Sequence, residues 1–266
     1  MSDRYALIGN PVAHSKSPWI HTRFARDCGQ DLEYGLIEAP VDGFAAAVDA
    51  FRAAGGRGLN VTLPFKEEAF RYCERTSARA APVVNTLVFD GDAFGDNTDG
   101  VGLVRDLQVN LGVELAGRRV LLMGAGGAAQ GVVGALLESG VAQLVVANRT
   151  LGRAQALAAR HPGVTAKSYA TLGEPVDIVV NATSAGLAGD ALALPHGLLG
   201  KGMLAYDMVY GRDTPFLATA RAAGARACDG LGMLVEQAAE SFLLWRGVRP
   251  ETGAPLAELR AALRQG

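Results

Sequence analysis

Apolar and polar residues follow two distinct patterns along almost the whole chain. Short apolar runs closed by Gly, Pro, Asn or Asp predict buried strands, and apolar residues spaced three or four positions apart predict amphipathic helices. Because the two patterns alternate, the sequence predicts an α/β protein whose mainly parallel sheets carry helices on their faces. The expected strands span residues 5–8, 32–37, 58–61, 120–123, 144–147, 178–181, 204–208 and 225–228.

Turn residues predict where the helices begin and end. Ser17-Pro18 has the pattern of an N-cap followed by a proline in the first helical turn, and Gly29 ends that helix. Asp90-Gly91-Asp92 favours a tight turn, which predicts a hairpin over residues 83–89 and 93–95. Further helices are expected over residues 41–54 and 98–111, after Pro64, from about 230 to 245, and after Pro255.

The order of the elements fits two modules. Residues 102–235 repeat strand and helix strictly, which predicts a Rossmann-type dinucleotide-binding domain. Residues 1–101 form a separate α/β domain, and residues 236–266 are expected to return as helices that pack on it. We expect the reaction site in the cleft between the two modules.

A glycine-rich turn follows the strand at residues 120–123. Gly124, Gly126, Gly127, Ala128 and Ala129 form a G-x-G-x-x-A pattern, which brings backbone N–H groups and a helix N-terminus close to a pyrophosphate. The motif alone is weak, because a turn of small residues also serves close packing. The apolar stretch 120–137 approaches the length of a membrane span, but its glycine cluster divides it into strand, turn and helix.

Basic residues follow the next strand, where an NAD enzyme would place an acid for the ribose. Asn148, Arg149, Thr150 and Arg153 offer charge and hydrogen bonds to a 2′-phosphate, which predicts NADP as the cofactor. The alternative is a solvated first helical turn.

Polar residues also gather at the strand ends of the first module. Each has a simpler explanation, since serines cap helices, lone lysines are usually solvated, and Asp-Asn-Thr-Asp-Gly is typical of turns. Together they indicate a pocket rich in hydroxyls with one lysine and one aspartate. The segments are Ser15-Lys16-Ser17, Asn60-Val61-Thr62 with Lys66, Asn85-Thr86, and Asp96 to Gly100.

Composition narrows the function classes. The net charge is −2 and no basic block occurs, which argues against a nucleic-acid or anionic-membrane partner. The cysteines at 28, 73 and 228 suit a reducing compartment. Neither they nor the histidines at 14, 21, 161 and 196 have metal-ligand spacing. We expect a cytoplasmic protein with a small-molecule ligand and no metal, either a monomer or a homodimer.

At this point the chain resembles the shikimate dehydrogenase family over nearly its whole length. The motifs that carry the resemblance are SKSP at 15–18, NVTLPFK at 60–66, NT at 85–86, DNTDG at 96–100, GAGGAA at 124–129, NRT at 148–150, NATSAG at 181–186, DMVY at 207–210 and DGLGMLVEQ at 229–237. The resemblance implies reversible reduction of 3-dehydroshikimate to shikimate with NADPH, in aromatic amino acid biosynthesis.

The resemblance also implies roles for individual residues. Lys66 and Asp99 are the catalytic pair. The substrate residues are Ser15, Ser17, Asn60, Thr62, Asn85, Tyr210 and Gln237. The cofactor residues are Gly124, Gly126, Gly127, Ala128, Ala129, Asn148, Arg149, Thr150 and Arg153, with Thr183, Met208, Gly230 and Met233 on the nicotinamide side.

One segment departs from the family pattern. Pro82-Val83-Val84 stands where the family has Gly-Ala and a small residue before Asn85-Thr86, and the proline fixes φ and removes a donor near the pocket. A quinate or dual quinate/shikimate dehydrogenase is the nearest alternative activity. A metabolite sensor without catalysis is an alternative of another class, against which the lysine–aspartate pair argues, and a structural nucleotide-binding module leaves the hydroxyl-rich half unexplained.

Overall fold

The chain divides into two units in the computed structural model, which describes residues 2–80, 82–183, 194–195 and 197–265. The terminal unit comprises residues 1–102 and 235–266, and the central unit comprises residues 103–234. The terminal unit is therefore assembled from both ends of the chain. Strands and helices alternate in both units, so the prediction of an α/β protein is confirmed.

The terminal unit is built on one mixed sheet. β1 is parallel to β2 and β3, whereas β5 runs antiparallel to both β3 and β6. The expected hairpin is present, with Gly91 at φ +78° in its turn, but its first strand begins at Thr86 and not at residue 83. The strand order is β2 (Leu32–Glu38), β1 (Asp3–Gly9), β3 (Gly56–Val61), β5 (Thr86–Asp90), β6 (Asp92–Asp96) and β4 (Arg75–Thr76).

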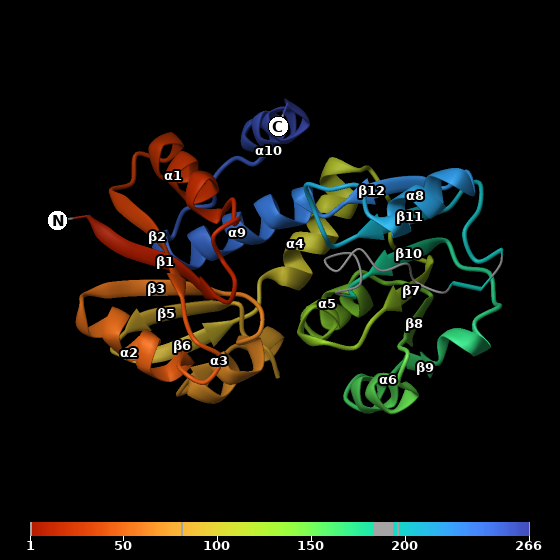
Figure 1. Ribbon diagram of the computed structural model, residues 1–266, viewed down its shortest axis with the longest axis horizontal. Coiled ribbons are helices and arrows are strands. Elements are labelled where there is room, and N and C mark those ends of the chain that lie inside the picture. The colour runs from red at the N-terminus through yellow and green to blue at the C-terminus, as the bar shows by residue number, and fades with distance from the viewer. Residues whose placement is uncertain (1, 81, 184–193, 196, 266) are drawn as a thin grey trace. The chain divides into compact units, whose positions relative to one another are not determined.

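Helices cover both faces of this sheet (Figure 1). On one face, α2 (Phe44–Ala53) and α3 (Lys66–Tyr72) bury an apolar core that includes Leu59 and Leu87. The opposite face carries α1 (Ser17–Asp27) and α9 (Leu231–Arg246), and α10 (Gly253–Gln265) follows as the last helix. A short 3₁₀ turn spans Ala78–Ala80. Because successive strand residues point to opposite faces, Asn60 faces away from the core that holds Leu59.

An aromatic cluster attaches α9 to the sheet. Trp245 stacks on Tyr5 at 4.6 Å between ring centroids, and its Nε1 donates to the backbone oxygen of Leu87 at 2.9 Å. A Cβ at Gly58 would lie 2.5 Å from Trp245 Nε1, so only glycine admits the indole here. The contacts explain why a C-terminal helix belongs to a unit made mainly of N-terminal residues.

The central unit contains a second six-stranded sheet, in which all strands run parallel. Its strand order is β12 (Arg226–Asp229), β11 (Leu204–Asp207), β10 (Ile178–Asn181), β7 (Arg119–Met123), β8 (Gln143–Ala147) and β9 (Val164–Lys167). Renumbered along the chain, this is the 3-2-1-4-5-6 order of the Rossmann fold, whose order reverses between β7 and β10.

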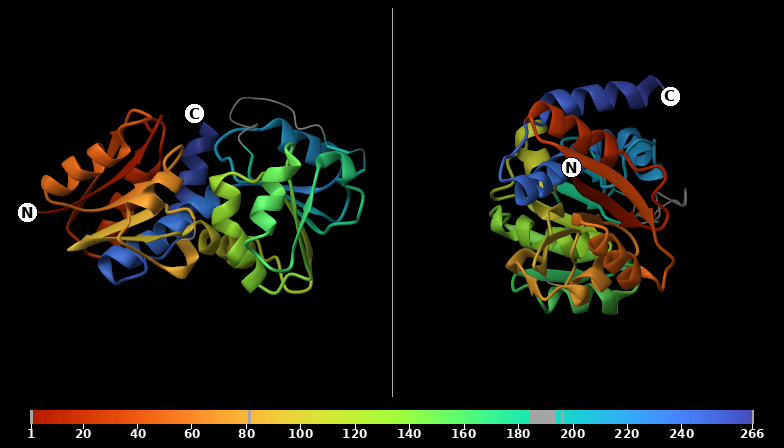
Figure 2. Two further views of the ribbon diagram at one scale, coloured as in Figure 1. Left: turned by 90° about the horizontal axis from the view of Figure 1, so that it is seen from below. Right: turned by 90° about the vertical axis from the view of Figure 1, so that its left-hand side faces the viewer.

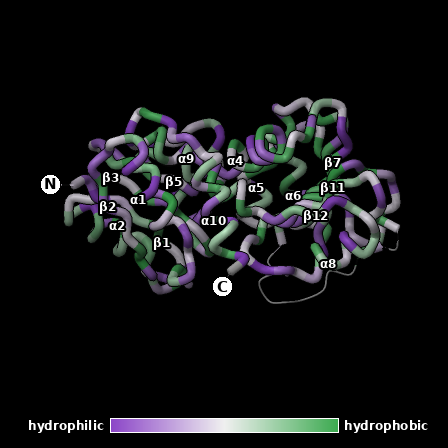
Figure 3. The backbone as a smooth tube through the Cα atoms, turned by 90° about the horizontal axis from the view of Figure 1, so that it is seen from above, coloured by the Kyte–Doolittle hydropathy of each residue, from purple (hydrophilic) through white to green (hydrophobic). Residues whose placement is uncertain are grey.

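Apolar residues pack against both faces of this sheet, and the backbone around β7 is largely green, for hydrophobic, in Figure 3. Along β7, Val120 and Leu122 join a core with α5 (Gly127–Glu138) and α6 (Leu151–Ala158). Leu121 and Met123 join a second core on the opposite face, with α8 (Pro215–Ala222). A short 3₁₀ turn, Tyr169–Thr171, precedes β10. Burial on both faces explains why these strands read as continuous apolar runs. The additional views in Figure 2 show helices on both faces of the sheet.

The helix expected over residues 98–111 changes its winding part-way. α4 (Asp99–Arg105) is followed by a π-helical turn over Asp106–Asn110. Asp106 is 1% exposed and accepts a 2.6 Å hydrogen bond from the Tyr206 hydroxyl. A Cβ at Gly232 would lie 1.9 Å from Asp106 Oδ1, so the carboxylate occupies space that only a glycine leaves open. No helix among the described residues is long and apolar enough to cross a membrane.

His21 on α1 is fully buried among aromatic rings. It stacks on Tyr34 at 4.2 Å with the ring planes 6° apart, and Phe242 lies 6.3 Å from it. No hydrogen bond of standard geometry reaches either ring nitrogen among the described residues, and the nearby Asn60 side chain acts to raise the pKa of His21, against the effect of burial. Burial lowers the pKa of His21 from 6.5 to about 3, so the folded protein holds this imidazole neutral.

We predict that His21 makes the fold sensitive to acid. Below pH 6.5 the imidazole of the unfolded chain binds a proton, whereas the imidazole of the folded chain stays neutral down to about pH 3. The stability contributed by neutral His21 is therefore fully present above pH 6.5 and is lost as the pH falls toward 3. The free energy of unfolding should fall by up to roughly 1.4 kcal/mol per pH unit in this range. Urea unfolding at several pH values, compared with His21→Phe, isolates the effect, since the variant lacks the titrating ring. Parallel pH profiles for the two proteins would contradict it.

Candidate functional site

A lysine and an aspartate form a largely buried ion pair in the terminal unit. Lys66 is the first residue of α3 and Asp99 the first residue of α4. Lys66 Nζ lies 2.5 Å from Asp99 Oδ2, and the two side chains are only 13% and 7% exposed. A charge-assisted hydrogen bond in such a setting fixes the direction of the ammonium group. The lysine is therefore not a solvated surface residue.

Asn85 connects this ion pair to the rest of the cluster. Its Nδ2 donates to Asp99 Oδ1 and to Thr98 Oγ1, both at 2.9 Å. Its Oδ1 accepts from the backbone N–H of Thr98 at 2.8 Å and from the Thr86 hydroxyl at 2.9 Å. Asn85 is 3% exposed, so protein groups satisfy almost all of its hydrogen-bonding capacity. It precedes β5, after the segment that departs from the family pattern.

Two further predicted residues reach the same cluster. Gln237, on α9, places Oε1 3.4 Å from both Asn85 Nδ2 and Thr98 Oγ1. Asn60, at the end of β3, accepts from the Tyr34 hydroxyl at 2.7 Å and donates to Ser241 at 2.9 Å. Elements from five parts of the sequence thus meet around one polar centre.

Ser15 and Ser17 lie next to each other at the start of α1. Ser15 Oγ donates to Ser17 Oγ at 3.1 Å, and Ser17 N–H donates to Ser15 Oγ at 3.2 Å. The prediction that Ser17 is the N-cap is wrong, because the cap position belongs to Lys16 and no side chain caps this helix. Ser17 is instead the first residue of the helix, and its hydroxyl is engaged by Ser15. Thr62 follows β3, and its N–H donates to Ile8 O at 3.0 Å.

In the central unit, the glycine turn joins β7 to α5. Gly124 has φ +103°, and a Cβ there would lie 3.0 Å from Ala182 O. Gly126 is the N-cap of α5 and is exposed, with φ −85° and no atom within 4 Å of the position of an added Cβ. The open space lies over the first turn of α5, which Gly127, Ala128 and Ala129 form. The turn therefore leaves room for a pyrophosphate against the helix N-terminus.

The four residues predicted to bind a 2′-phosphate lie after β8, around the start of α6. Asn148 Nδ2 donates to Thr150 O at 2.9 Å, and Thr150 is the N-cap of α6. Arg149 and Arg153 are exposed, and neither forms an ion pair with another described residue. Two exposed guanidinium groups beside a dinucleotide turn suit a phosphate dianion.

The remaining predicted residues follow the carboxyl ends of β10, β11 and β12. Thr183 donates its N–H and hydroxyl to Asn181 Oδ1, at 3.1 and 2.7 Å. A Cβ at Gly230 would lie 2.4 Å from Met208 O, which explains the glycine. Met233 is 7% exposed and belongs to the core, and Tyr210 lies in the loop after β11.

Several polar residues of these clusters were not singled out from the sequence. Ser241 lies one helical turn after Gln237 on α9, and that spacing was the available signal. Asn181 and Asp207 end apolar strands, and burial raises the pKa of Asp207.

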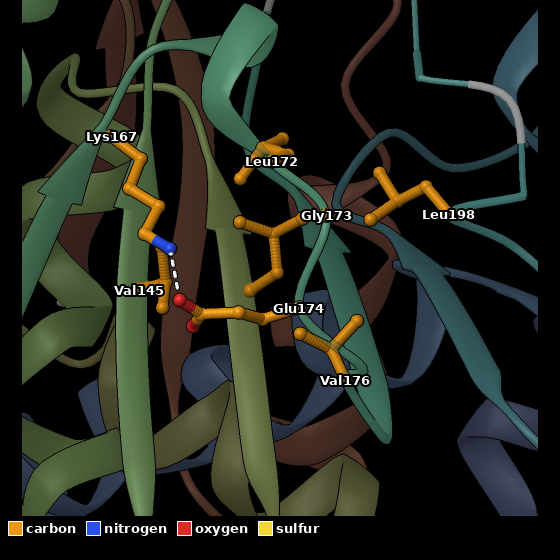
Figure 4. Close-up of a pocket in the computed structure, with 8 residues that line it drawn as sticks. Val145, Lys167, Leu172, Gly173, Glu174, Val176 and Leu198 are labelled. Atoms are coloured by element: carbon orange, nitrogen blue, oxygen red, sulfur yellow. Dashed lines mark hydrogen bonds and ion pairs between the residues drawn. The ribbon is translucent and has the colours of Figure 1, made fainter.

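A small cavity lies near β8, lined by residues that include the Lys167–Glu174 ion pair (Figure 4). Its volume of about 10 Å³ is too small for a metabolite. No group of three potential metal ligands occurs among the described residues, which do not include His196.

Known proteins resemble the chain along its whole length. Family models match at residues 7–87 (shikimate dehydrogenase substrate binding domain), 107–188 (shikimate/quinate 5-dehydrogenase) and 230–264 (shikimate 5′-dehydrogenase C-terminal domain). A shikimate dehydrogenase (NADP⁺) of Dechloromonas aromatica is 56% identical over 99% of both chains. The chain belongs to the shikimate dehydrogenase family.

Several solved structures have the same fold as this chain. An Ael1 enzyme from Pseudomonas putida is 50% identical, with a TM-score of 0.92 over 97% of this chain and 98% of that one. The shikimate 5-dehydrogenase of Thermus thermophilus, in complex with NADP(H) and shikimate, is 36% identical, with a TM-score of 0.88 over 98% and 99%. The prediction of a substrate domain with a Rossmann domain is thus confirmed at the level of the fold.

We predict that alanine at two glycines of the turn separates folding from cofactor binding. Gly124→Ala should destabilise the protein by roughly 1–3 kcal/mol, because its φ is positive and its Cβ would meet Ala182 O. Gly126→Ala should leave stability near wild type, because its Cβ would touch no protein atom. It should weaken NADP⁺ binding, because the same Cβ would occupy the space left for the pyrophosphate. Thermal melting and fluorescence titration with NADP⁺ measure both. Unchanged NADP⁺ affinity in Gly126→Ala would show that no pyrophosphate lies at this turn.

Proposed function

We propose that this chain is an NADP-dependent shikimate dehydrogenase, which reversibly reduces 3-dehydroshikimate to shikimate. The observation that carries the proposal is identity of 56% over 99% of the chain to a protein of that activity. In the proposal, residues 1–101 with the helices of 236–266 hold the substrate, and residues 102–235 hold NADP. The location is the cytoplasm, and the protein is a monomer or homodimer.

The alternatives receive less support. Curated relatives that are 53% to 57% identical bear the name shikimate dehydrogenase (NADP⁺), and none of these is named a quinate dehydrogenase. A sensor without catalysis has no use for the buried Lys66–Asp99 ion pair. The exposed Arg149 and Arg153 favour NADP over NAD, whose ribose lacks the phosphate.

NADPH, when bound, supplies the hydride for the ketone carbon. Lys66 stabilises the negative charge that grows on the ketone oxygen and donates a proton to it. Asp99 holds the ammonium group in position through the 2.5 Å contact. In the reverse direction, Lys66 accepts the proton from the substrate hydroxyl.

The remaining residues hold the reactants. Orientation contributes several kcal/mol to reactions between bound partners, so their task is to fix the substrate ring. The proposed substrate ligands are Ser15, Ser17, Asn60, Thr62, Asn85, Tyr210 and Gln237. The proposed cofactor ligands are the turn from Gly124 to Ala129, the group Asn148, Arg149, Thr150 and Arg153, and Thr183, Met208, Gly230 and Met233 on the nicotinamide side.

We predict that the wild-type protein oxidises shikimate with NADP⁺ and prefers this pair to NAD⁺ or quinate. Arg149→Ala should weaken NADP⁺ binding by roughly 1.5–3 kcal/mol, because a charge-assisted phosphate contact is lost, and should leave NAD⁺ use unchanged. The assay follows nicotinamide absorbance with each cofactor and substrate. Arg118→Ala is the matched control, since this exposed arginine precedes the amino-terminal end of β7, whereas Arg149 follows the carboxyl end of β8. Equal use of NADP⁺ and NAD⁺ by the wild type would contradict the cofactor assignment.

We predict that Lys66 and Asp99 act as one unit. Lys66→Ala should lower kcat by roughly 10²–10⁴-fold, as expected for a lost general acid. Asp99→Asn should lower kcat by a similar factor, and the kcat of the double variant should be little lower than that of either single variant. Lys167→Ala is the control, because it breaks another lysine–carboxylate contact, of 2.6 Å, away from this cluster. Multiplicative losses in the double variant would show that the two residues act independently.

A further inference from the structure

Asn85 can adopt only one orientation of its amide. Its Oδ1 faces the backbone N–H of Thr98 at 2.8 Å, which can only donate, and its Nδ2 faces the Asp99 carboxylate at 2.9 Å. Rotating the amide by 180° would place its NH₂ against the Thr98 N–H, donor against donor, and its oxygen against the Asp99 carboxylate, acceptor against acceptor. The assignment of oxygen and nitrogen is therefore determined by the neighbours.

This orientation determines the direction of the neighbouring hydroxyl bonds. Thr86 Oγ1 lies 2.9 Å from Asn85 Oδ1, which can only accept. The Thr86 hydroxyl therefore donates its one hydrogen to Asn85. Thr86 Oγ1 also lies 2.8 Å from Ser241 Oγ, so any hydrogen between these two oxygens comes from Ser241. The backbone oxygen of Gln237 and the Thr98 hydroxyl are further acceptors within reach of that hydrogen, at the longer distances of 3.0 and 3.2 Å. The Thr86 and Ser241 side chains are 0% exposed, so solvent supplies no alternative partner.

Asn60 continues this series of hydrogen bonds from Ser241 to Tyr34. Ser241 Oγ accepts from Asn60 Nδ2 at 2.9 Å, and Asn60 Oδ1 accepts from the Tyr34 hydroxyl at 2.7 Å. Burial raises the pKa of Tyr34 well above its usual value, so this hydroxyl keeps its proton and donates. Asn60, Ser241, Thr86 and Asn85 thus each accept on one side and donate on the other, and Tyr34 begins the series as a donor.

We propose that Tyr34, Ser241 and Thr86 are positioning residues, which act through the Asn60 and Asn85 amides to hold the Asp99 carboxylate against Lys66. The complete series runs Tyr34, Asn60, Ser241, Thr86, Asn85, Asp99, with every hydrogen bond pointing toward the carboxylate. Hydrogen bonds aligned in one direction polarise one another and strengthen in a buried setting. The inference rests on the proposed function, since it assigns these residues to the Lys66–Asp99 unit.

The three positioning residues come from three separate elements. Tyr34 lies on the edge strand β2, Thr86 begins β5, and Ser241 lies on α9, four residues after Gln237. Ser241 joins the strands to the helix that carries a proposed substrate ligand. The substrate ligands and the catalytic pair thereby share one rigid frame, as precise catalytic geometry requires.

The decisive variant is Thr86→Val, which keeps the shape of the side chain and removes the hydroxyl. It should lower kcat for shikimate oxidation about tenfold and leave the KM for NADP⁺ unchanged, as expected from the loss of one buried hydrogen bond. Thr86→Ser restores the hydroxyl and should recover most of kcat. Ser241→Ala interrupts the same series one step earlier and should lower kcat in the same direction, and the double variant should be little worse than Thr86→Val.

Thr252→Val is the matched control. Thr252 is 7% exposed and its hydroxyl donates to Glu236 at 2.8 Å, so the variant also loses a buried hydroxyl bond to the protein. It should lower the melting temperature and leave kcat unchanged. Wild-type kcat in folded Thr86→Val and Ser241→Ala, or a loss in Thr86→Val that Thr86→Ser does not recover, would overturn the inference alone. A wild-type protein that does not oxidise shikimate would instead overturn the proposed function, and the inference with it.

Discussion

Asn85 must satisfy its amide inside the protein, and this constraint organises the polar half of the terminal unit. Its side chain is almost inaccessible to water, so an unpaired donor or acceptor there would cost about 1–3 kcal/mol, more than a typical hydrogen bond contributes. The backbone before α4, the start of β5 and the helix α9 all supply partners. Once they do, Asp99 and Lys66 have one favourable arrangement, and the ion pair follows from the amide.

The central unit meets a different constraint. Its four inner strands, β7, β8, β10 and β11, are buried on both faces, so most of their side chains are apolar, and polar residues gather where these strands end. Asn181 and Asp207, the last residues of their strands, mark the point where this rule relaxes. The glycines at 124 and 230 then bring backbone close to backbone at the same edge. The apolar sheet interior and the close backbone contacts of these glycines are thus two consequences of one burial pattern.

Sequence patterns predicted the repeating strands and the residues of the motifs, because both depend on local spacing. They did not predict the features that depend on distant partners. The Ser17 cap was wrong, since Lys16 holds the cap position and Ser15 engages the Ser17 hydroxyl. The Asp106 carboxylate occupies space left by a glycine 126 positions later in the chain. His21 gave no signal of burial, because its aromatic neighbours come from β2 and α9. Ser241 lies one helical turn after Gln237, but its partners Asn60 and Thr86 come from β3 and β5, which the spacing along α9 does not reveal.

The discontinuity of the terminal unit has a consequence for the birth of the protein. A ribosome delivers the central unit as one uninterrupted stretch, whose sheet needs nothing from the residues that follow 234. The sheet of the terminal unit emerges first, yet it lacks Trp245, Phe242 and Ser241 until the last helices leave the exit tunnel. Domains otherwise tend to fold in the order of synthesis. Here strands made before the central unit are completed after it, and their aromatic face stays uncovered in the interval.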